Sequence, residues 1–130
     1  MTDNFDYDLL IIGSGPGGYV AAIRAAQLGL KTGCIESRET LGGTCLNAML
    51  HASELYHEAH SGALEKFGVK LTGAKLDLKQ MLAEKLKAVE ELTGGIAFLF
   101  KKNKVDWIKG RGAFEDAHTV KVGDKSYTAK

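Results

Sequence analysis

Several residue types that mark particular protein classes are scarce in this chain of 130 residues. It has one proline, Pro16, and two cysteines, Cys34 and Cys45, too few for the disulfide framework of a small secreted domain. No apolar run approaches the roughly 18 residues of a membrane-spanning helix. The acidic first six residues lack the basic region of a signal peptide. We therefore expect a protein of a reducing compartment without a membrane span.

An excess of charge of either sign is also lacking, because 17 lysines and arginines face 16 aspartates and glutamates. The formal net charge of +1 gives no reason to expect nucleic acid or an anionic membrane as a partner. What is present is an ordinary globular composition, with 45% hydrophobic and 25% charged residues. The length is sufficient for one domain with its own core.

The apolar patterning predicts an α/β fold. A βαβ unit is expected, with strand, helix and strand over residues 7–12, 16–28 and 31–36. Two amphipathic helices should follow over residues 48–66 and 77–102, the second kinked or broken at Thr93-Gly94-Gly95. Four short strands are predicted over residues 105–108, 112–115, 119–122 and 126–129. Gly123-Asp124 is expected to form a hairpin turn between the last two.

Residues 13–18 read Gly-Ser-Gly-Pro-Gly-Gly and fit the GxGxxG pattern between the first strand and the helix. Gly13 permits the tight turn, Gly15 the approach of a pyrophosphate, and Gly18 close packing of helix on strand. Glu36 ends the second strand and could accept both hydroxyls of an adenosine ribose. The alternative, a plain turn with a solvated Glu36, is disfavoured because four features coincide. This pattern alone does not distinguish FAD from NAD.

The segment after Glu36 resembles the flavin-dependent disulfide oxidoreductases. Residues 41–47 read Leu-Gly-Gly-Thr-Cys-Leu-Asn, residues 51–56 read His-Ala-Ser-Glu-Leu-Tyr, and both are most similar to the dihydrolipoamide dehydrogenase family. Residues 4–8, 17–22, 92–95 and 110–112 fit the same family, so the resemblance covers the whole chain.

The resemblance implies a Rossmann-like FAD-binding domain with a parallel sheet, flanking helices and a small antiparallel element, here partial and truncated over residues 1–130. Catalytic chemistry would involve Cys45. The implied cofactor-binding residues are Gly13, Gly15, Pro16, Gly17, Gly18, Glu36, Ser37, Gly43, Thr44, Gly112 and Ala113. NAD would bind only the parent enzyme, which oxidises dihydrolipoamide and associates with 2-oxo acid dehydrogenase complexes. A bacterial cytoplasm or the mitochondrial matrix is the implied compartment.

The chain departs from the family pattern directly after Asn47. The family continues there with Val-Gly-Cys-Ile-Pro-Ser-Lys, whereas this sequence goes straight to Ala48. The seven residues include the second redox cysteine, so Cys45 has no local partner with which to bridge. Cys34 is expected to be a small buried hydrophobe instead. The fragment is therefore expected to be inactive in the parent reaction.

Three functions stay open from the sequence: a partial FAD-binding domain of such an enzyme, a stand-alone nucleotide-binding module, or a cofactor-free fragment that self-associates. The strand over residues 7–12 would have an open edge, because the family's next strand lies beyond Lys130. A homodimer is therefore expected, through edge pairing or exchange of elements. His57 and His60 lie three residues apart on a predicted helix, but we expect solvated histidines and no metal.

Overall fold

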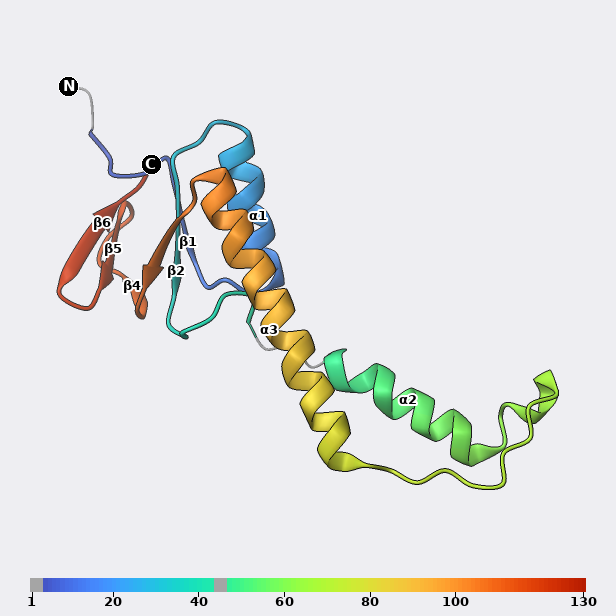
Figure 1. Ribbon diagram of the computed structural model, residues 1–130. Coiled ribbons are helices and arrows are strands. Elements are labelled where there is room, and N and C mark those ends of the chain that lie inside the picture. Colours follow the sequence, from blue (N-terminus) through green and yellow to red (C-terminus); the bar gives the residue numbers. More distant parts are fainter. Residues whose placement is uncertain (1–3, 44–46) are drawn as a thin grey trace. The chain divides into compact units, whose positions relative to one another are not determined.

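The computed structural model describes residues 4–43 and 47–130, without the side chains of residues 47 and 48 (Figure 1). The chain divides into two compact units. The first combines Met1–Thr44 with Leu92–Lys130, and the second is Cys45–Glu91.

A parallel sheet forms the centre of the first unit. Its strands are β1 (Leu9–Ile12), β2 (Thr32–Glu36) and β3 (Asp106–Lys109), in the order β1-β2-β3. Helix α1 (Pro16–Gln27) connects β1 to β2 and completes the predicted βαβ unit. Tyr7 lies just outside β1, in an isolated parallel bridge with Ala129.

The predicted small antiparallel sheet is also present in the first unit. It contains β4 (Gly112–Phe114), β5 (Thr119–Val122) and β6 (Lys125–Thr128), each strand paired with the next. Gly123, at a φ of 60°, makes the hairpin turn between β5 and β6, as the sequence predicted. The α/β fold class with these two sheets is therefore confirmed.

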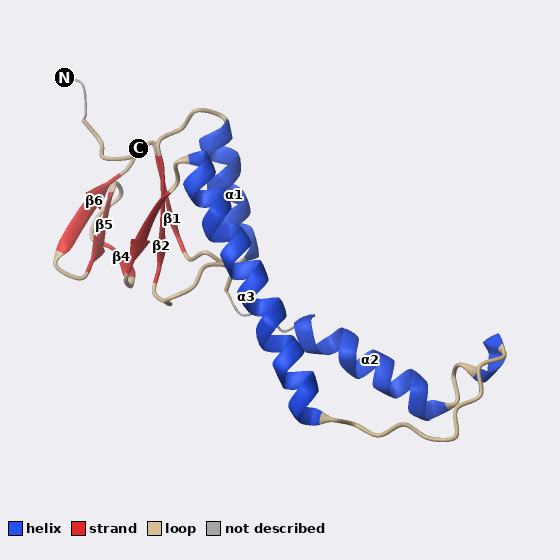
Figure 2. Ribbon diagram, in the orientation of Figure 1, coloured by secondary structure: helices blue, strands red, loops and turns tan. Residues whose placement is uncertain are grey.

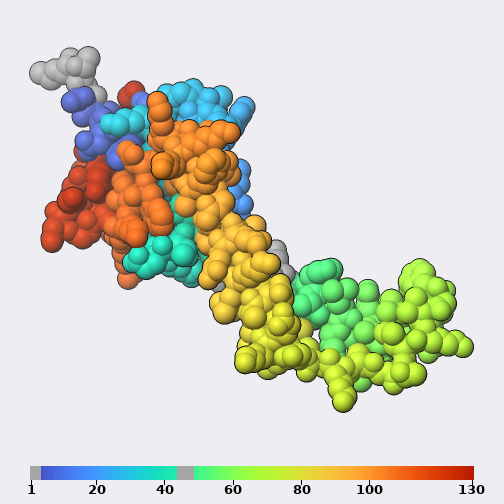
Figure 3. All heavy atoms as spheres, viewed as in Figure 1, coloured from blue at the N-terminus to red at the C-terminus, as the bar shows by residue number. Residues whose placement is uncertain are grey.

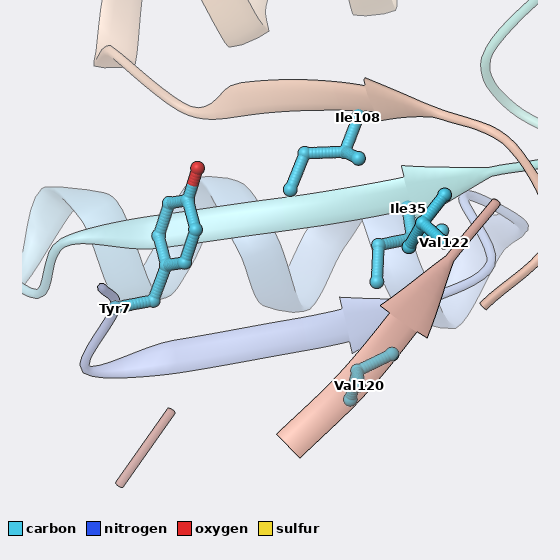
Figure 4. Close-up of a cluster of buried hydrophobic side chains, with 5 residues drawn as sticks. All are labelled: Tyr7, Ile35, Ile108, Val120 and Val122. Atoms are coloured by element: carbon cyan, nitrogen blue, oxygen red, sulfur yellow. The ribbon is translucent and has the colours of Figure 1, made fainter. Parts of the chain in front are cut away.

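Strand β2 separates two buried clusters because successive side chains of a strand point to opposite faces. On one face Ile35 packs with Tyr7, Ile108, Val120 and Val122, which come from both sheets (Figure 4). On the other face the fully buried Cys34 packs with Ala22 of α1, Leu41, Phe100 and Val105. The first unit thus has helix, parallel-sheet and antiparallel-sheet layers, and the space-filling view shows the antiparallel strands (red) at its side (Figure 3).

The second unit contains α2 (Asn47–Ser61), a short 3-10 turn (Glu65–Phe67) and the beginning of α3 (Leu78–Asn103). The expected single helix over residues 48–66 is wrong at its end, because Gly62 takes a φ of 75° and terminates α2. No helix among the described residues is long and apolar enough to cross a membrane.

Of the kink or break expected at Thr93-Gly94-Gly95, the break is wrong, since α3 runs uninterrupted from Leu78 to Asn103 (Figure 2). Burial just beyond the two glycines supplies the physical reason. Phe100 is fully enclosed, and Ile96 and Ala97 pack against the same cluster. Packing of these side chains offsets the loss of about 1 kcal/mol that each glycine causes in a helix interior.

Candidate functional site

The turn between β1 and α1 needs glycine at both ends. Gly13 has a φ of 95°, and its N–H donates a 2.7 Å hydrogen bond to the carbonyl oxygen of Ile35. A Cβ on Gly18 would lie 1.9 Å from the carbonyl oxygen of Gly13. The structure thus gives Gly13 and Gly18 the turn and packing roles expected from the sequence.

The beginning of α1 offers backbone donors to an anion. Gly15 is the N-cap residue, and no side chain caps the helix there. Pro16 occupies the first turn, which contains no acidic residue. A Cβ on Gly15 or Gly17 would meet nothing within 4 Å, so the backbone borders open space. Unpaired N–H groups and the positive end of the helix dipole favour a phosphate at such a place.

Glu36 ends β2 as a buried carboxylate with 6% of its surface exposed. Its Oε2 accepts hydrogen bonds from the backbone N–H of Ser14 (3.0 Å) and from the Ser14 hydroxyl. Its Oε1 accepts one from the N–H of Arg38 (3.0 Å). Burial by itself raises the pKa of the Glu36 carboxyl, but the bonds from Ser14 and Arg38 outweigh it and lower this pKa below its ordinary value. The group is an anion at neutral pH.

A pocket of about 210 Å³ opens beside this carboxylate. Eight residues line it: Ile12, Gly13, Ile35, Glu36, Ser37, Gly110, Arg111 and Gly112. The structure therefore brings together four residues that the sequence predicted for the cofactor, namely Gly13, Glu36, Ser37 and Gly112. Ala113 follows in β4 and is exposed, outside the lining.

The loop before residue 44 lies against the glycine turn. Gly42, at a φ of 101°, donates its N–H to the carbonyl oxygen of Ser14 (2.9 Å). A Cβ on Gly43 would lie 3.2 Å from the Cα of Gly15, so these two backbones approach closely. The predicted site residues Thr44 and Cys45 lie outside the described residues.

Cys34 has the properties of a small buried hydrophobe, as expected. It is fully buried, is not part of a disulfide, and its Sγ lies 3.8 Å from the carbonyl oxygen of Gly13. Burial and the nearby Glu36 carboxylate raise the pKa of this thiol to about 11. The thiol stays protonated near neutral pH and is a poor nucleophile.

The histidine pair His57 and His60 lies on α2. The His60 ring stacks on Tyr56 with 5.7 Å between ring centroids. Over residues 4–43 and 47–130, no three His, Cys, Asp or Glu residues gather closely enough to hold a metal ion.

Sequence reasoning missed two parts of the site. Ser14 is a variable position of the glycine pattern, yet it is fully buried and contacts Glu36 and Gly42. A polar residue inside the predicted glycine turn, directly after an apolar strand, was the available signal. Gly110 and Arg111 line the pocket next to the predicted Gly112, where the resemblance had included the Gly-Arg-Gly run without a role.

Comparison with known proteins decides the family. The model of a family described as pyridine nucleotide-disulphide oxidoreductase matches residues 7–130. The chain belongs to this family.

Among the relatives, a leghemoglobin reductase of Vigna unguiculata is 57% identical over 123 residues, which cover 88% of this chain and 23% of that protein. Dihydrolipoyl dehydrogenase 2 of Arabidopsis thaliana is 55% identical over 90% of this chain and 24% of its own length. Dihydrolipoyl dehydrogenase 3 of Pseudomonas aeruginosa is 56% identical over 80% and 24%.

The predicted resemblance to dihydrolipoamide dehydrogenase is thus confirmed, and the chain spans about a quarter of the length of these relatives.

Proposed function

We propose that this pyridine nucleotide-disulphide oxidoreductase chain forms the adenosine and pyrophosphate part of an FAD site. The pocket that joins Gly13, Glu36, Ser37 and Gly112 beside the uncapped start of α1 carries the proposal. The residues proposed to contact FAD are Gly13, Gly15, Pro16, Gly17, Gly18, Glu36, Ser37, Gly43, Thr44, Gly112 and Ala113.

Each part of the site would bind one part of the dinucleotide. The open space at Gly15 and the free N–H groups at the start of α1 suit the pyrophosphate. Glu36 suits the ribose, because its carboxylate accepts hydrogen bonds and would repel a 2′-phosphate. Gly112 lines the same pocket and is proposed to border the adenine; a Cβ there would lie 3.3 Å from the side chains of Ile12 and Ile35.

The parent reaction is the oxidation of dihydrolipoamide, with electrons passing through a redox disulfide and FAD to NAD. FAD, when bound, would supply the two-electron carrier between thiols and NAD. Cys45 is the proposed redox thiol of this chain. A disulfide with the buried Cys34 would have to break the packing around it, and the sequence has no third cysteine. We therefore propose that the chain binds FAD without turning over lipoamide.

FAD titration of the purified chain tests this function. Quenching of flavin fluorescence or of the single tryptophan, Trp107, would report binding. Gly15→Ala should weaken binding at least tenfold while stability is unchanged, because a Cβ there meets only open space in the free chain. Gly94→Ala, in the middle of α3, is the control and should bind as the unaltered chain does.

Absence of any FAD binding at flavin concentrations up to millimolar would contradict the proposal. Lipoamide-dependent oxidation of NADH should be absent in every variant, and measurable turnover would show that the chain needs no second redox cysteine. In a longer protein that contains this chain, the further partners would be NAD and a 2-oxo acid dehydrogenase complex. The compartment would be a bacterial cytoplasm or the mitochondrial matrix.

A homodimer is favoured by one specific observation, the free edge of β1. In the described part of the chain, Leu9–Ile12 pairs with β2 on one side, while the other side has only the bridge from Tyr7 to Ala129. A pocket of about 160 Å³ beside this edge includes Leu9, Leu10 and Val120. A free strand edge next to apolar side chains pairs readily with another chain. Light scattering across a range of concentrations should show dimers, and a clean monomer would contradict this.

A further inference from the structure

Ser14 uses every polar atom it has, although no part of it is exposed. Its N–H donates to Glu36 Oε2 (3.0 Å), and its hydroxyl donates to the same oxygen. Its carbonyl oxygen accepts the N–H of Gly42 at 2.9 Å, and the same N–H points at the Ser14 Oγ at 3.2 Å. One buried residue thus joins the glycine turn, the end of β2 and the loop that precedes Thr44.

The serine hydroxyl suits this place because it donates and accepts at once. Alanine at residue 14 would keep the two backbone contacts but remove the hydroxyl contact from a buried carboxylate. Hydrogen bonds stabilise the ionised form of a buried carboxylate, so the loss of one of them makes ionisation less favourable. The Gly42 N–H would also lose the second of its two acceptors.

We propose that Ser14 is a positioning residue of the dinucleotide site, which holds the Glu36 carboxylate in place for the ribose and fixes the Gly42-Gly43 backbone against the glycine turn. The proposal rests on the FAD site argued above. Ser14 itself is fully buried and is not among the residues that line the pocket. It acts on the ligand through Glu36 and through the loop.

The hydrogen bonds of Glu36 indicate which donor leaves when a ribose arrives. A carboxylate has about four acceptor positions. The structure fills these with the two donors of Ser14, the N–H of Arg38 and the Ser37 hydroxyl. The Ser37 contact is the longest, at 3.4 Å, and its side chain is exposed. A ribose hydroxyl would therefore replace Ser37, while Ser14 stays in place.

Other charged or titratable groups surround Glu36 and must be kept constant in any test. Cys34 lies two residues earlier in β2, and its raised pKa keeps it neutral. Lys109 is the register partner of Glu36 in β3, but its Nζ is 2.9 Å from Glu39. Arg38 follows in the same segment, and Arg111 lines the pocket. None of these residues is altered in the variants below.

The first experiment compares two serines whose hydroxyls each donate to a carboxylate, Ser14 to Glu36 in the site and Ser126 to Glu115 outside it. FAD titrations of Ser14→Ala should show about tenfold weaker binding than the unaltered chain. Ser126→Ala, the matched control, removes a serine hydroxyl that donates to Glu115 outside the site and should bind within twofold of the unaltered chain. Ser14→Thr keeps the hydroxyl and should recover most of the affinity. Equal losses in the two alanine variants, or affinity in Ser14→Ala equal to the unaltered chain, would overturn the proposal.

The second experiment needs no ligand, and its first part uses the unaltered chain. Carbon-13 NMR of the Glu36 carboxyl in the unaltered chain should give a pKa below the ordinary glutamate value. An ordinary or raised pKa would overturn the proposal, whether or not FAD binds. In folded Ser14→Ala this pKa should rise, whereas in Ser37→Ala it should change much less. If the unaltered chain binds no FAD, the FAD site is refuted, and this titration alone decides whether Ser14 controls Glu36.

Discussion

The glycine turn and the segment from α2 to the start of α3 differ in how their residues are held. Around the turn, Ser14, Cys34, Ile35, Glu36 and Leu41 are almost completely buried. In contrast, none of residues 49–91 is buried. Both regions have well-formed secondary structure. This contrast indicates that amphipathic patterning is enough to form helices. The candidate site, by comparison, exists only where burial fixes the backbone and the side chains together.

The largest difference in stability between the two regions is expected when one leucine of each region is replaced by alanine. Leu41 is 1% exposed and Leu86 is 56% exposed. We expect Leu41→Ala to lower the free energy of unfolding by about 2–5 kcal/mol, since it creates a cavity in a packed cluster. Leu86→Ala should lower it by less than about 1 kcal/mol. Urea unfolding followed by circular dichroism measures both, and equal losses would remove the distinction between the regions.

Two adjacent glycines of α1, Gly17 and Gly18, are expected to differ in how strongly alanine changes the stability of the chain. Gly18→Ala should destabilise the chain by about 1–3 kcal/mol or more, because its Cβ meets a backbone carbonyl oxygen that cannot rotate away. Gly17→Ala meets nothing within 4 Å and should be neutral or stabilising by up to about 1 kcal/mol. Thermal unfolding distinguishes them. Tolerance of alanine at residue 18 would show that helix and turn are less closely packed than described.

Acid should affect the buried region through Glu36. Its folded-state pKa is lowered, so the carboxylate stabilises the fold above its ordinary pKa of about 4.5 and loses this contribution as pH falls through the folded value. We expect Glu36→Gln to be destabilising at pH 7, with a difference from the unaltered chain that shrinks as the pH falls below 4.5. Urea unfolding at several pH values measures it. A difference that is independent of pH would contradict the lowered pKa.

The smallest effect is expected where α3 continues through its glycines. Gly94→Ala should stabilise the chain by up to about 1 kcal/mol, because a Cβ there has open space and one of the two flexible residues of the helix is removed. Gly29→Ala, at a φ of 87°, is the opposite case and should destabilise by a similar amount. Thermal unfolding of both variants measures the two signs. A loss of stability in Gly94→Ala would indicate that the helix needs glycine there.

The sequence predicted those parts of the fold and site that follow from local rules. The βαβ order, the turn at Gly13, the hairpin at Gly123 and the place of Glu36 all came from short patterns. Contacts between distant segments could not be predicted in this way. The bonds of Ser14 to Glu36 and Gly42 join residues 22 and 28 positions apart, and the continuity of α3 depends on where Phe100 is buried.

The rate at which the Cys34 thiol is chemically labelled can report how often this region opens. Its Sγ is enclosed between the glycine turn and the helix layer, and a pKa near 11 leaves few thiolates even in mildly alkaline buffer. A thiol reagent can therefore reach it only when α1 and its turn separate from β2. The rate at which the peptide containing residue 34 becomes labelled would measure how often that opening occurs. If FAD binds as proposed, it would slow the labelling of Cys34 in proportion to the fraction of chains that have FAD bound.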